Sequence, residues 1–137
     1  MWWIYALLAA VFASLTAIFA KIGVSGVNSD LATAIRTIII LVLAWAIVLA
    51  RGEWKGVAVL SKYNMLFLVL SGLATGLSWI FYFKALQLGD VSKVAPVDKL
   101  SVALTIALSV LFLNESLTLK TAVGAIFIVA GTLVIVL

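Results

Sequence analysis

Cysteine and histidine are both missing from the 137 residues of this chain. The absence of cysteine excludes disulfides and thiolate metal ligands, and the absence of histidine excludes imidazole ligands and the Ser-His-Asp and Cys-His catalytic arrangements. No glycine-rich phosphate-binding loop occurs either. We therefore expect no enzyme, no catalytic residues, no bound metal ion and no cofactor.

Charge is also scarce, because charged residues make up 10% of the chain and hydrophobic residues 66%. The apolar residues form five long runs: Trp2–Ile22, Leu31–Ala50, Met65–Leu86, Val94–Leu113 and Leu117–Leu137. Each run is near the roughly 20 residues that cross a bilayer as a helix. A water-soluble core of this size cannot bury five helices that are apolar all round. The predicted fold class is an all-α integral membrane protein with five transmembrane helices.

The connections between the runs are short, so we predict one transmembrane domain over residues 1–137. Small polar residues near the starts of three runs predict helix N-caps: Ser29 or Asp30, then Ser92, and then Ser116 or Thr118. Pro96 near the start of the fourth run has two readings. It belongs either to an ordinary first helical turn or to an interrupted helix of the kind found at transporter sites.

An odd number of spans places the termini on opposite sides of the membrane, so a second copy continues the bundle only if it is inverted. The two sides carry similar numbers of lysines and arginines, and the positive-inside rule therefore permits insertion both ways. We expect dual topology and an antiparallel homodimer. The net charge of +4 would suggest nucleic acid in a soluble protein. Here we attribute it to lysines that meet lipid headgroups, so membrane lipid and not nucleic acid is the expected partner.

Five charged residues lie inside the spans or at their ends, where burying a charge is costly. They belong to the same predicted end of the bundle: Lys21, Arg36, Lys84, Asp98 and Lys99. We interpret them as a basic collar with one embedded carboxylate, Asp98, which pairs with Arg36, Lys84 or Lys99. Snorkelling to the headgroups is the alternative for the long basic side chains.

Two stripes of hydroxyl groups run deeper from this collar. One stripe is Asp98, Ser101, Thr105 and Ser109, and the other is Ser71, Thr75, Ser78 and Tyr82, with Trp79 alongside. They are interpreted as walls of a polar path, although hydroxyls in membrane helices also bond their own backbone. Ser14 is, besides Thr16, the one central polar group of the first run.

Small residues predict where transmembrane helices approach closely. The first run has alanines at three- and four-residue steps, the third has Gly72 and Gly76, and the fifth has Gly124 and Gly131 on one face. We expect the first and third helices to use theirs for packing within one bundle.

Two segments carry a family resemblance, FYFKALQLGDVSKVAPVDK at 81–99 and FLNESLTLKTAVGAIFIVAG at 112–131. Through them the whole chain resembles the EamA domain of the drug/metabolite transporter superfamily. In that family a five-helix unit usually occurs twice, as inverted repeats, and short members carry one unit. The related small multidrug resistance proteins are antiparallel dimers whose last helices meet through glycines seven apart, which implies that Gly124 and Gly131 form the dimer interface. Their first-helix glutamate has no equivalent here, and the resemblance implies a structural role for Glu115.

The expected function is a secondary transporter or exchanger of a small anionic or zwitterionic metabolite in a prokaryotic cytoplasmic membrane. Arg36 would clamp a carboxylate or phosphate, with Lys99, Lys84 and Lys21 supplying positive field and Asp98 exchanging its ion pair. The remaining candidate site residues are Trp79, Tyr82 and Ser14. The alternative is a non-transporting or heteromeric membrane subunit, such as part of a lipid-carrier flippase.

Overall fold

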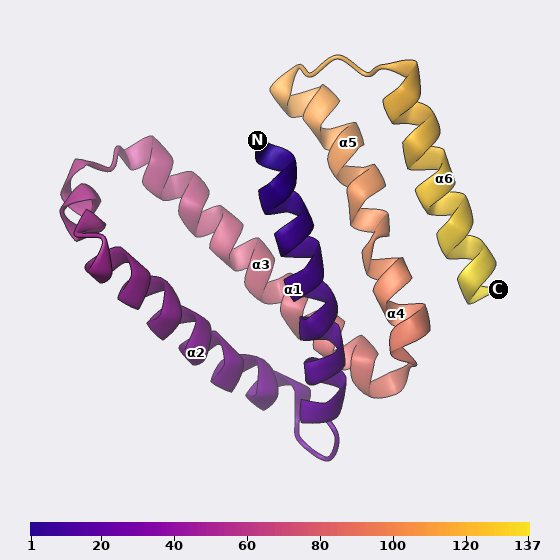
Figure 1. The fold of residues 1–137 in the computed structure, drawn as a ribbon, viewed down its shortest axis with the longest axis horizontal. Helices are drawn as coiled ribbons and strands as arrows, with labels where there is room; N and C mark the ends of the chain where they lie inside the picture. Colours follow the sequence, from indigo (N-terminus) through magenta and orange to yellow (C-terminus); the bar gives the residue numbers. More distant parts are fainter. The chain divides into compact units, whose positions relative to one another are not determined.

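The computed structural model describes residues 1–137, and all of its regular structure is helical (Figure 1). The helices are α1 (Trp2–Gly23), α2 (Ser29–Ala50), the 3₁₀ helix η1 (Glu53–Val59), α3 (Lys62–Leu88), α4 (Val91–Asp98), α5 (Leu100–Leu113) and α6 (Leu119–Val136). Five segments are long and apolar enough to cross a membrane, with α4 and α5 together forming the fourth. The predicted all-helical fold with five spans is confirmed.

The start of α2 differs from the predicted caps. Asn28, and not Ser29 or Asp30, is the N-cap, and its side-chain oxygen accepts from the backbone N–H groups of Asp30 and Leu31 at 2.9 and 3.1 Å. An asparagine one residue before the helix reaches these first N–H groups without leaving the extended conformation that a cap requires. The cap satisfies two of the donors that a helix start leaves unpaired.

Of the other two predicted N-caps, one is confirmed and one is wrong. Thr118 caps α6 as expected, since its hydroxyl accepts from the N–H of Thr121 at 3.2 Å. Ser92 does not cap α4, because that helix begins one residue earlier, at Val91, with Asp90 in the cap position and no side-chain bond. The backbone carbonyl of Asp90 already accepts from the N–H groups of Lys93 and Val94.

The fourth span is interrupted at Lys99, between α4 and α5. Pro96 lies in the second turn of α4, where its missing N–H deprives the Ser92 carbonyl of a donor. The N–H of Lys99 donates to the Pro96 carbonyl, three residues back, at 3.0 Å and also to the Ala95 carbonyl at 3.3 Å. Pro96 therefore lies beyond the first turn and accompanies a local break at Lys99, whose backbone stays in the right-handed helical region (φ −71°, ψ −8°); whether this break serves a transport site stays a prediction.

The chain divides into two compact units. One comprises residues 1–18 and 88–137, and the other residues 19–87. In the first, α6 packs against both α4 and α5, and α5 and α6 run side by side (Figure 1). In the second, the buried apolar residues Ala20, Val24, Phe83 and Leu86 belong to the end of α1, the turn after it and the end of α3.

The small residues of α1 and α3 are covered to different degrees. Ala17 and Ala20 are buried, whereas the alanines nearer the start of α1 are exposed. Within residues 19–87 no other helix approaches a Cβ added at Gly72 or Gly76 to within 4 Å, and the packing of this α3 pair inside the bundle stays a prediction. At most 11% of any candidate span is buried within the chain. The helices within each unit therefore leave most of the apolar surface of the spans uncovered.

Candidate functional site

Arg36 is a charged residue inside a membrane span, and most of the residues around it are apolar. It follows the start of α2 by seven residues, which is roughly 10 Å along the helix axis. Its guanidinium carbon lies over the rings of Trp79 and Phe83, at 4.3 and 5.0 Å from their centroids. The side chain is half-buried. The contact joins α2 to α3 through a cation and two aromatic faces.

The two rings belong to one face of α3, because residues four apart in a helix are neighbours on its surface. Phe83 is only 2% exposed and anchors this face, while Trp79 is half-buried. The Tyr82 ring meets Phe83 edge-on, with the centroids 6.4 Å apart. A cation–π contact is worth about 0.5–1 kcal/mol at an exposed site and about 2 kcal/mol when desolvated, which offsets part of the cost of placing Arg36 in a span.

Besides the two rings, Arg36 interacts electrostatically with Tyr82. No carboxylate, carbonyl or hydroxyl of the chain accepts a hydrogen bond from its guanidinium. An arginine carries five N–H donors in a rigid planar fork and no acceptor. The chain therefore holds a fork of donors in a membrane span and supplies no acceptor for it.

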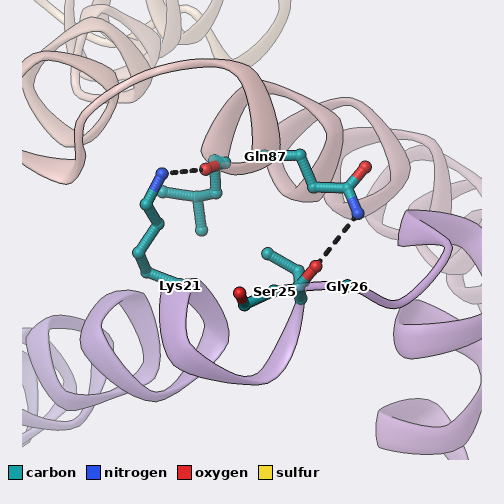
Figure 2. Close-up of a pocket in the computed structure, with 6 residues that line it drawn as sticks. Lys21, Ser25, Gly26 and Gln87 are labelled. Atoms are coloured by element: carbon teal, nitrogen blue, oxygen red, sulfur yellow. Dashed lines mark hydrogen bonds between the residues drawn. The ribbon is translucent and has the colours of Figure 1, made fainter.

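Lys21 lies at the last turn of α1 and donates to the backbone carbonyl of Leu86 at 2.6 Å. Gln87 donates in the opposite direction, to the carbonyls of Val24, at 3.1 Å, and Val27. Figure 2 shows these side chains on two sides of one pocket. The pocket has a volume of about 380 Å³ and is lined by Lys21, Val24, Ser25, Gly26, Leu86 and Gln87.

The Lys21 contact is that of a cation at a helix C-terminus. Carbonyl groups at the end of a helix carry partial negative charge, so an ammonium group there is stabilising. Lys21 meets this charge at the end of α3 and also belongs to the last turn of α1. Its geometry fits a link between helix ends, in addition to the positive field that the sequence assigns to it.

The other charged candidates are distributed as follows. Lys84 is exposed, and its ammonium makes no hydrogen bond or ion pair. Asp98 pairs with Lys99 at 3.0 Å, which is one of the three partners predicted for it. This ion pair stands at the interruption of the fourth span, with the Asp98 side chain 34% exposed and that of Lys99 57% exposed.

Several hydroxyls of the predicted polar path bond their own helix. Ser14 donates to the Val11 carbonyl at 2.7 Å, Thr75 to the Ser71 carbonyl at 2.8 Å, and Ser109 to a carbonyl of its own helix three residues back. Such local bonds satisfy a hydroxyl without a ligand. For these residues the alternative interpretation holds: their hydroxyls bond the backbone of their own helix.

Thr132 is a hydroxyl that connects helices. It is 5% exposed, and its Oγ1 donates to the carbonyl of Ile128 at 2.9 Å or of Pro96 at 3.2 Å. The Pro96 contact ties α6 to the interrupted span. On the same helix, Gly124 and Gly131 have no atom within 4 Å of an added Cβ, so the chain itself leaves these two predicted interface positions uncovered.

The contacts of Phe83 and Gln87 were not predicted. Phe83 carries a sequence signal, because it lies four residues after Trp79 and therefore on the same helix face. Gln87 has a weaker one, an amide placed at the end of an apolar run. Neither signal predicts the partner: that Phe83 meets Arg36 of α2, or that Gln87 meets carbonyls of the turn at 24–27.

Comparisons with known proteins agree with the resemblance. The EamA-like transporter family matches residues 1–137. The chain is 52% identical over 134 residues to a Sinorhizobium protein named an uncharacterized transporter in the cobO 3′ region, covering 98% of this chain and 95% of the relative. It is 30% identical over 132 residues to an uncharacterized protein of Methanocaldococcus jannaschii, covering 96% and 93%. No solved structure matches.

The matched range spans the whole chain, and the five candidate membrane helices lie within it. The family and the named relative support a multi-pass membrane transporter, which is not an enzyme in the usual sense. The chain belongs to the EamA-like transporter family, as a single half-size domain.

Proposed function

We propose that the chain is one half of a secondary transporter or exchanger for a small polar solute that carries a carboxylate or phosphate group. The observation that carries this proposal is Arg36, a guanidinium in a membrane span that is stacked on Trp79 and Phe83 and donates to no group of the chain. Ionisable residues inside spans usually mark a substrate or ion pathway.

The anionic class of the solute follows from the chemistry of arginine. Its planar fork matches the two oxygens of a carboxylate or phosphate and forms two parallel charged hydrogen bonds. A cationic solute would meet repulsion from the same group. A zwitterionic solute is compatible, with its carboxylate on Arg36.

The other candidate residues have supporting roles in the proposal. Lys99, Lys84 and Lys21 add positive field, and Asp98 exchanges its Lys99 partner for solute or a proton. Tyr82 and Trp79 contribute an aromatic wall. Ser14 is the least supported member, since its hydroxyl is already bonded to Val11.

The proposed working unit is an antiparallel homodimer of ten helices. Five spans leave the two termini on opposite sides, and the sparse burial of the spans leaves surface for a second copy. In an inverted pair each side of the membrane receives one Arg36, so both entrances attract the same solute. This symmetry suits alternating access in an exchanger. A bacterial and an archaeal relative support placement in a prokaryotic cytoplasmic membrane.

A thermal-shift screen of the purified protein tests the solute class. The panel contains amino acids, organic acids, phosphorylated metabolites and organic cations. Ligand binding to the folded state raises stability by about 2.7 kcal/mol at a hundred times the Kd. We expect stabilisation by solutes with a carboxylate or phosphate. Stabilisation by organic cations alone would refute the anionic assignment.

A further inference from the structure

The Arg36 guanidinium combines an aromatic contact with N–H donors that bond no group of the chain. Its guanidinium carbon lies over the Trp79 ring at 4.3 Å and the Phe83 ring at 5.0 Å from their centroids. The N–H bonds of an arginine lie in the plane of the group and point outward from its edge. No acceptor of the chain takes a hydrogen bond from the group, and Tyr82 is the polar residue that interacts with it electrostatically. The guanidinium is held by aromatic rings, and its N–H donors are left for another partner.

An arginine in a span would otherwise move. Its side chain carries about 2 kcal/mol of rotamer entropy and can snorkel toward the headgroups. Stacking on a ring removes much of that freedom before any ligand arrives. Phe83 is 2% exposed and shares the Trp79 face of α3, so the aromatic surface beneath the guanidinium is itself anchored.

We propose that Trp79 is a positioning residue, which holds the Arg36 guanidinium through a cation–π contact so that its N–H donors are presented to the carboxylate or phosphate of the solute. This inference rests on the proposed function and gives Trp79 a second role, in addition to its part in the aromatic wall. The ring acts through Arg36. The affinity for the anion rises because the Arg36 side chain is already ordered in the ligand-free protein, so binding does not have to bear that entropy cost.

The experiment measures anion binding to purified, full-length protein by thermal shift, with succinate and inorganic phosphate as the two probes. Trp79→Leu removes the ring, Trp79→Phe keeps a smaller aromatic face, and Trp45→Leu is the matched control on α2. Trp45 is 45% exposed and has no ring contact with Arg36.

We expect Trp79→Leu to need roughly tenfold more anion for the same shift, the equivalent of a cation–π contact of about 1.4 kcal/mol. Trp79→Phe should stay within about threefold of the wild type, and Trp45→Leu should match it. Rescue by phenylalanine separates a stacking role from a general loss of packing, which both substitutions cause.

Wild-type anion binding in Trp79→Leu overturns the inference and leaves the proposed function intact. Equal weakening in Trp79→Leu and Trp79→Phe also overturns it. If Trp79→Leu does not fold, Trp79→Met tests the same contact, since it removes the aromatic ring and keeps a long apolar side chain; unchanged affinity there contradicts the inference. A wild-type protein that neither anion stabilises refutes the proposed function, and the inference with it.

Discussion

The two units of the chain join their helices by different means. Within residues 88–137, α6 lies directly against α4 and α5, and one hydroxyl, that of Thr132, links the helices by a hydrogen bond. Within residues 19–87, long side chains make the connections. Lys21 and Gln87 reach backbone carbonyls across helix ends, and Arg36 reaches two rings on α3.

From this difference we infer that the unit with closely packed helices is a scaffold and that residues 19–87 form the solute site. Helices in close contact leave little room for a ligand, and small residues are what permit such contact in membranes. Helices joined by long polar side chains leave a pocket and donors that lack acceptors. We therefore expect solute chemistry to be concentrated in residues 19–87 and contacts between copies to be concentrated on α6.

The largest expected effect comes from Arg36→Ala. Transport in proteoliposomes should fall by roughly a hundredfold or more, because a bidentate charged pair is worth about 3 kcal/mol. The protein should stay folded and dimeric. Arg51→Ala is the control, since Arg51 is the only other arginine and follows the end of α2. Full activity of Arg36→Ala would refute the site.

Lys99→Ala asks whether the first unit shares in the chemistry. Lys99 pairs with Asp98 at the interruption of the fourth span, and we expect its loss to abolish transport as well, because Asp98 would keep an uncompensated charge. The same flux assay measures it. Undiminished flux would confine the solute chemistry to residues 19–87 and sharpen the division between the units.

Gly131→Ile tests the α6 surface. No atom of the chain lies within 4 Å of an added Cβ, so the monomer should fold normally. Overpacking at a helix interface costs about 1–3 kcal/mol, so the dimer should weaken by roughly tenfold or more, as measured by cross-linking against protein concentration. Ala130→Ile places the same bulk on an adjacent, exposed position. An unaffected dimer would remove α6 from the interface.

Gln87→Leu should lower the free energy of unfolding by about 1–3 kcal/mol, because the carbonyls of Val24 and Val27 lose their donor. Denaturant unfolding in detergent micelles measures the change. Ser25→Ala lies in the same pocket, but the Ser25 hydroxyl has no hydrogen-bond partner, so this control should be nearly neutral. Equal stability of both variants would show that side-chain bridges do not hold this unit together.

Thr132→Val should have the smallest effect, about 1 kcal/mol of unfolding free energy. The substitution removes one hydroxyl bond but keeps the packed shape of α6. Ser101→Ala is the comparison, since Ser101 is exposed and makes no hydrogen bond. A loss as large as that of Gln87→Leu would mean that the first unit also depends on polar bridges.

Much of the fold was predictable because hydropathy and helix length are local properties. The five spans, the Thr118 cap and the whole-length family resemblance came from short patterns of residues. The Asn28 cap was missed, since several capping residues stand together in the stretch Asn28-Ser29-Asp30 and only geometry selects among them. The local break at Lys99 follows Pro96, for which the sequence left two readings open.

The site was less predictable, because periodicity tells which residues share a helix face and not which helix that face meets. Arg36 and Trp79 were both candidates, but their stacking required the placement of α2 against α3. The polar path shows the converse. Hydroxyls on one face resembled a channel wall, whereas Thr75 and Ser109 bond their own backbone.

The unequal lengths of α3 and α6 make bilayer thickness a variable for this protein. With 27 residues, α3 is roughly 40 Å long, which exceeds the roughly 30 Å hydrocarbon core, so it must tilt or extend its Lys62 end among the headgroups. With 18 residues, α6 is roughly 27 Å long and has nothing to spare. In a thicker membrane α3 would still span the hydrocarbon core, whereas α6 would become too short for it. Longer lipid chains would therefore cause hydrophobic mismatch first at α6, the helix that carries Gly124 and Gly131.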